Sequence, residues 1–226
     1  VQTYKLGKLN SCGALGLLRI DMKVPMINYQ NPELNTHYDY VGIIYGLSGE
    51  ERVNFGITTE LSNFLRNEKL PVVDKLVNTK QEMLDALNLF LIDAKSGKRF
   101  MLHFVAHGNE DGILIGDEFI TWDVLRTTLQ DINMATKGTL LLNMSTCKGL
   151  HGVKIVPASG EYPFFGLIGA KNDLDVSDAL NANKIMYRKW LDDLPVQQIV
   201  PETNKEIGKD VLFNISSEGF RKLTNP

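Results

Sequence analysis

Apolar residues follow two patterns along this chain. Some short runs are apolar almost throughout, as in strands buried on both faces of a sheet; they cover 40–45, 100–106, 138–144 and 164–169. Elsewhere apolar residues recur every three or four positions, as on the buried face of a helix; these segments cover 59–68, 79–95, 122–132 and 176–193. Because strands and helices alternate, we expect an α/β fold: a three-layer α/β/α sandwich with a mainly parallel central sheet.

Weaker patterns predict the remaining elements. Three segments have strand character, namely an edge strand at 17–24, a short strand at 71–77 and a hairpin over 112–120. We expect a turn at 46–49 and a long mobile connection over 149–163. Residues 196–226 contain one expected strand, 211–215, and otherwise have the character of a loop. No repeat or linker divides the sequence, so we expect a single domain over 1–226.

Composition and charge narrow the classes of partner. The chain has 226 residues, 43% hydrophobic and 23% charged, which is the balance of a globular protein rather than a disordered one. Its formal charge of −3 provides no general attraction to nucleic acid or to an anionic membrane. With no apolar run long enough for a signal peptide or a membrane span, we expect a cytoplasmic protein. Two cysteines, Cys12 and Cys147, are too few for a disulfide scaffold and fit a reducing compartment.

Two of the predicted strands end in residues that can carry chemistry. The strand before 107 runs into His107-Gly108, and the strand before 145 runs into Ser-Thr-Cys147-Lys-Gly. Loops at the carboxyl ends of neighbouring parallel strands converge, so we expect His107 and Cys147 to meet. A cysteine nucleophile needs a base that takes its proton and later protonates the leaving amine, which a histidine can do. Alone, either residue is more typical of a core side chain; the joint pattern favours a reactive pair.

These two blocks resemble the caspase-like superfamily of cysteine peptidases, in particular prokaryotic members such as the CHAT domains associated with tetratricopeptide repeats. The resemblance covers about residues 38–193 and is sharp at 103–115 and 141–149. It implies His107 as the catalytic histidine, Cys147 as the nucleophile, and an oxyanion hole formed by the amides of Gly108 and Cys147. It further implies a protein substrate, an activating or regulatory protein partner, and a role in prokaryotic stress or antiviral defence. Residues 1–37 and 194–226 would then be peripheral strands and loops.

The residues that would select a substrate depart from the family pattern. Two positions before the nucleophile, caspases carry glutamine and metacaspases usually aspartate, whereas this chain has Ser145. Acidic residues in two predicted loops could accept a basic side chain at P1, the residue before the scissile bond; these are Glu50, Glu51, Asp173 and Asp175. We therefore predict a basic P1 preference. Arg52 in the first loop indicates the opposite preference, for an aspartate at P1. Each of these charged side chains could instead be solvated, and Asp175 could instead cap a helix.

The other histidines suggest different roles. His151 is a second candidate partner for Cys147, but it lies in the exit loop outside the resemblance. His103 lies inside an apolar run, and we expect it to make a hydrogen bond in the core. His37 and Cys12 have no ligand spacing, so we expect neither a metal nor an organic cofactor.

Three functions compete at this point. The leading one is a cysteine endopeptidase that cleaves selected proteins through a Cys147–His107 dyad and an acyl-enzyme, with no third catalytic group identifiable. The second is a catalytically silent caspase-like module that regulates or binds another protein. The third, a flavodoxin-like nucleotide-binding domain, shares the layer order but requires a phosphate loop, and Gly46-Leu-Ser-Gly49 lacks the lysine and spacing of one.

Overall fold

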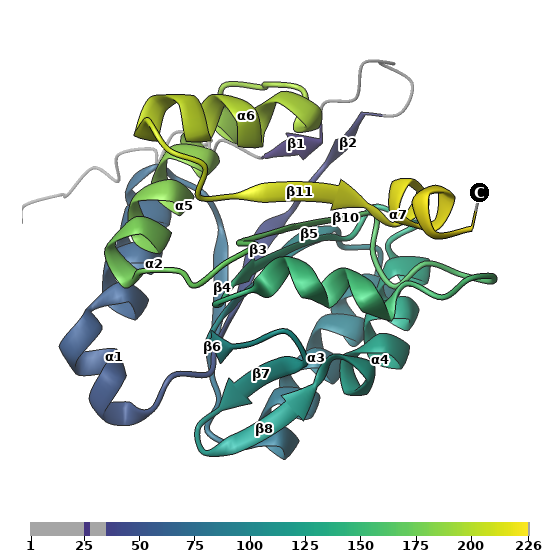
Figure 1. Ribbon diagram of the computed structural model, residues 1–226, viewed down its shortest axis with the longest axis horizontal. Helices are drawn as coiled ribbons and strands as arrows, with labels where there is room; N and C mark the ends of the chain where they lie inside the picture. Colours follow the sequence, from purple (N-terminus) through teal and green to yellow (C-terminus); the bar gives the residue numbers. More distant parts are fainter. Residues whose placement is uncertain (1–24, 28–34, 226) are drawn as a thin grey trace, which may run out of the picture.

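A six-stranded sheet forms the centre of the molecule. The computed structural model describes residues 25–27 and 35–225 (Figure 1). The strands lie in the order β11-β10-β9-β5-β3-β4, and β11 alone among them runs antiparallel to its neighbour. Their bounds are β3 Tyr40–Tyr45, β4 Val72–Leu76, β5 Phe100–Val105, β9 Leu141–Ser145, β10 Gly166–Gly169 and β11 Phe213–Ser216. The predicted α/β fold with a mainly parallel sheet is confirmed.

Helices cover both faces of the sheet, as Figure 1 shows. One face carries α3 (Lys80–Lys95) and α4 (Trp122–Ala135), whose apolar side chains pack with Phe100, Leu102 and Phe104 of β5. The opposite face carries α2 (Ile57–Asn67), α5 (Val176–Leu191) and α6 (Val196–Ile207). Strands β3, β5 and β9 are buried along their whole length. Their sequences are therefore mostly continuous apolar runs rather than alternating apolar and polar residues.

Two small antiparallel sheets flank the central one. The first contains β6 (His107–Gly108), β7 (Gly112–Ile115) and β8 (Glu118–Thr121), and it contains the predicted hairpin. The second pairs β1 (Met26–Ile27) with β2 (Thr36–His37). Because β6 follows β5 after a single residue, this first sheet leaves the central sheet at the end that carries His107.

Three predictions about loops need correction, and one predicted strand lies outside the part of the chain that the structure describes. The segment predicted as a turn and charged loop contains helix α1 (Gly49–Phe55), because Ser48 and Glu51 form a capping box. The expected mobile connection begins with a 3-10 helix, η2 (Gly149–Ile155). The predicted C-terminal loop holds α6 and α7 (Ser217–Thr224), so that prediction was wrong. The strand predicted at 17–24 lies outside the described residues.

Helix α6 was missed because Pro201 lies inside it, and proline usually ends a helix. Tertiary contacts offset that penalty. Its apolar face, with Ile199 and Val200, joins the core on the α5 side of the sheet. The side chain of Asn204 accepts hydrogen bonds from the Val211 and Leu212 amides and donates one to the Leu212 carbonyl, which ties the helix to the segment before β11.

None of the helices in the described ranges combines the length and apolar character needed to cross a membrane.

Candidate active site

The sheet register brings His107 and Cys147 to the same edge. Strands β5 and β9 are parallel neighbours in which Val105 pairs with Ser145, and each of the two candidate residues follows two positions later. Both side chains line one small cavity of about 60 Å³. The convergence expected from strand order is therefore observed. A much larger cavity, about 710 Å³, lies away from this edge and is lined by Leu141 and Gly166, the first residues of β9 and β10.

Gly108 allows the two loops to approach closely. A Cβ atom at this position would lie 2.9 Å from the carbonyl oxygen of Cys147 and 2.9 Å from Cβ of Thr146. Both distances are shorter than a carbon atom tolerates, and one of the groups is backbone that cannot turn aside. A glycine after His107 is thus required for the cysteine loop to lie where it does.

His107 has a carboxylate partner that the sequence did not indicate. Its Nε2 atom lies 2.6 Å from Oε1 of Glu51, while the other oxygen of Glu51 accepts a hydrogen bond of 2.9 Å from the Ser48 amide at the start of α1. Burial by itself would raise the pKa of Glu51, but the hydrogen bonds from Ser48 and His107 outweigh it and hold this pKa below its usual value. Glu51 is therefore ionised at neutral pH and held in place by a helix cap.

This contact changes two expectations. Glu51 was predicted at the rim of a substrate pocket, but it binds the histidine instead. A third group beside the pair, which sequence reasoning did not identify, is thereby present. The signal that could have found it is local, because Ser48-Gly-Glu-Glu51 has the spacing of a capping box and so predicts a helix after β3.

The sulfur of Cys147 is held by the loop that follows β10. The Leu174 amide donates a hydrogen bond of 3.3 Å to Sγ, and the Lys148 amide donates one of 2.9 Å to the Asn172 carbonyl. Cys147 is a free, partly exposed thiol. Its own backbone N–H has no acceptor within the described part of the chain, so this donor is available to a ligand.

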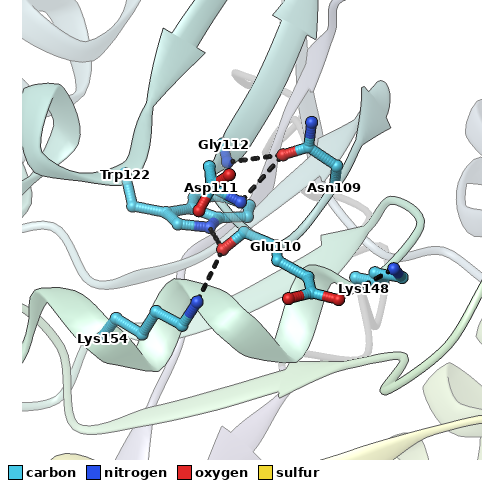
Figure 2. A network of polar contacts seen from close by, with 7 residues as sticks. All are labelled: Asn109, Glu110, Asp111, Gly112, Trp122, Lys148 and Lys154. Carbon is cyan, nitrogen blue, oxygen red and sulfur yellow. Dashed lines mark hydrogen bonds and ion pairs between the residues drawn. The ribbon is translucent and has the colours of Figure 1, made fainter.

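A polar network outside the cavity joins the two loops (Figure 2). Lys148, next to the cysteine, forms an ion pair of 2.9 Å with Glu110 of the histidine loop. The backbone carbonyl of Glu110 accepts hydrogen bonds from Nε1 of Trp122 at 3.0 Å and from Nζ of Lys154 at 3.1 Å. The side chain of Asn109 accepts from the next amides of its own loop. The mutual hydrogen bond lowers the pKa of Glu110 and raises that of Lys148.

A second network is buried around Ser145, which lines the same cavity as Cys147. His103 is fully buried, with Nδ1 2.8 Å from the Tyr187 hydroxyl and Nε2 2.7 Å from Oγ of Ser145. Asn183 donates to the same Oγ at 2.7 Å. Burial lowers the pKa of His103 to about 3, so it is neutral at physiological pH. The expectation that His103 makes a core hydrogen bond is confirmed.

The remaining predicted residues lie as follows. Ser145 lines the cavity, with its hydroxyl engaged by His103 and Asn183. Asp175 caps α5, since it accepts from the Ser177 amide at 2.8 Å, as in the alternative considered for it. The other three charged side chains are not among the described residues that line the cavity; these are Glu50, Arg52 and Asp173.

The guanidinium of Arg52 donates a hydrogen bond of 2.6 Å to the side-chain oxygen of Asn78, and this contact connects α1 to the segment before α3. His151 lies in η2, and it too is not among the described residues that line the cavity. The described residues contain no group of three or more His, Cys, Asp or Glu side chains arranged to hold a metal ion.

The sequence matches no protein-family model and no curated protein.

Proposed function

We propose that this protein is a caspase-like cysteine endopeptidase in which Cys147 is the nucleophile and His107 the general base. The observation that carries the proposal is the shared register of β5 and β9, which leaves both side chains on one cavity. A thiol, an imidazole and a free backbone donor at the same place are what acyl transfer requires. A free thiol as nucleophile also suits a cytoplasmic, reducing location.

In the reaction we propose, the thiol proton of Cys147 passes to His107 while Sγ attacks the carbonyl carbon of the substrate. Since Nε2 of His107 is engaged by Glu51, Nδ1 is the ring nitrogen left to accept the proton. The amides of Cys147 and Gly108 stabilise the resulting oxyanion. Collapse of this intermediate breaks the C–N bond, and the amine leaves with the proton from His107. Water, deprotonated by His107, then hydrolyses the thioester and restores the thiol.

Glu51 acts in this proposal as a positioning residue. It orients the imidazole and stabilises the positive charge that forms on it, as a carboxylate does behind a catalytic histidine. The geometry gives it no contact with the reacting atoms other than through His107.

Replacing Glu51 with glutamine should lower kcat by roughly ten- to a hundredfold and leave KM nearly unchanged. Glutamine still accepts the Ser48 amide and so keeps the helix cap, but it lacks the charge. Steady-state kinetics and thermal unfolding of the same preparations measure both effects. Glu50→Gln, the same change on the exposed neighbour, is the matched control and should be silent. Equal kinetics for Glu51→Gln and Glu50→Gln would remove Glu51 from the mechanism.

The proposed function is tested with a diverse peptide library whose cleavage products are identified by mass spectrometry. We expect new termini at defined bonds, and we expect a thiol-reactive electrophile to modify Cys147 and stop the cleavage. A library left intact by the unmodified protein would favour a binding module on the same scaffold.

A further inference from the structure

The cavity beside His107 and Cys147 has a chemical character that the loop charges did not suggest. Most of its wall is aliphatic, and five of these side chains belong to the core on the sheet face that carries α2 and α5: Leu47 follows β3, Ile57 begins α2, and Leu174, Val176 and Ala179 belong to the start of α5 and the loop before it. Three of these side chains, Leu47, Ile57 and Ala179, are themselves almost completely buried.

Three of the charged side chains near this edge have contacts within the protein, and neither Glu50 nor Asp173 is among the described residues that line the cavity. Asp175 caps α5, Arg52 binds Asn78, and Glu51 binds His107. The hydroxyl of Ser145 accepts from Asn183 and can donate to His103, so its donor is used inside the protein. Among the described residues that line this cavity there is no Asp, Glu, Lys or Arg. A charged side chain that enters it would lose its water and gain no ion pair from this lining, which is strongly unfavourable.

Resting on the proposed function, we infer that this cavity is the P1 pocket and that it selects a small aliphatic residue, alanine or valine, with valine the upper limit. Its volume is about 60 Å³. An apolar cavity of about 150 Å³ holds benzene, so by proportion this cavity has room for about two to three carbon atoms. Aromatic side chains exceed that size and charged ones lack partners. The substrate class is therefore a protein with an aliphatic residue before the cleaved bond, rather than a basic or acidic one.

A set of peptides that differ only at P1 tests this inference. We expect kcat/KM for alanine and valine peptides to exceed that for aspartate and lysine peptides by about a hundredfold or more, because the charged side chains must be desolvated. Phenylalanine should also be poor. A best substrate with aspartate, lysine, arginine or phenylalanine at P1 would overturn the inference while leaving the peptidase proposal intact. Failure to cleave any of these peptides or the diverse library would instead refute the peptidase proposal.

A charge introduced into the wall provides an independent measurement. Val176→Asp places a carboxylate at the first position of α5, where the helix terminus stabilises it, so the fold should be retained. For a peptide with 2,3-diaminopropionate at P1, a cation small enough for this cavity, the ratio of kcat/KM to that of the valine peptide should rise by tenfold or more in this variant. Asn181→Asp adds the same charge on the exposed face of α5 and should leave the ratio unchanged. An unchanged ratio in Val176→Asp would show that Val176 does not contact P1 and would overturn the assignment.

Discussion

Replacing Cys147 with alanine should lower kcat/KM for peptide cleavage by at least about a thousandfold, and replacing His107 with alanine should lower it nearly as far. Without Sγ no acyl-enzyme forms, and without the imidazole neither the thiol nor the leaving amine has a proton partner. The double variant should be no worse than Cys147→Ala, because the two residues act in one step and their losses are not additive. Hydrolysis of the best library peptide measures all three variants.

Both variants should keep the fold, and circular dichroism with thermal unfolding checks this. Cys147 is partly exposed, and its sulfur has two weak contacts with the backbone of Leu174: it accepts from the amide at 3.3 Å and lies 3.8 Å from the carbonyl oxygen. His151→Ala is the matched control for a histidine near the cysteine and should retain most activity. A Cys147→Ala protein within tenfold of the unmodified one, which is about 1.4 kcal/mol in barrier, would exclude the nucleophile assignment. Equal losses for His151→Ala and His107→Ala would exclude the choice of base.

Lowering the pH from 7 to 5 should reduce the free energy of unfolding by about 2 kcal/mol through His103 alone. In the folded chain burial holds the pKa of this histidine at about 3, whereas in the unfolded chain it returns to about 6.5. Below pH 6.5 the unfolded state therefore binds a proton that the folded state does not. The stability that His103 contributes is complete above pH 6.5 and is lost as the pH falls toward 3.

Urea unfolding at pH 7 and pH 5 measures this dependence. The His103→Gln variant should be less stable at both values, because the Tyr187 and Ser145 hydroxyls lose their partner, but its stability should fall less between the two. His37→Gln, a change at an exposed histidine, should leave the pH dependence as it is. An identical fall in the unmodified protein and in His103→Gln would mean that His103 is not the group responsible.

The amino-acid sequence alone determined the elements whose signals lie within a few residues of one another. Apolar runs predicted β3, β5, β9 and β10, and helical spacing predicted α2, α3, α4 and α5. The same local reasoning identified His107 and Cys147, because each follows a buried strand and the connection between the strands favours parallel neighbours. Helix α1 could have been predicted in the same way, because its capping box is also a local signal. Helix α6 was not predicted, because Pro201 lies inside it.

Tertiary structure decided which side chains meet. Glu51 and His107 are 56 positions apart, and the Leu174 amide lies 27 positions from the sulfur that it contacts. Such contacts depend on the order of strands in the sheet and on the angle at which each loop leaves it, and neither is encoded in a short stretch of sequence. For the same reason the charges at Asp175 and Arg52 predicted a polar pocket, whereas the folded chain uses them for a helix cap and a loop contact and lines the cavity mainly with aliphatic side chains from distant segments.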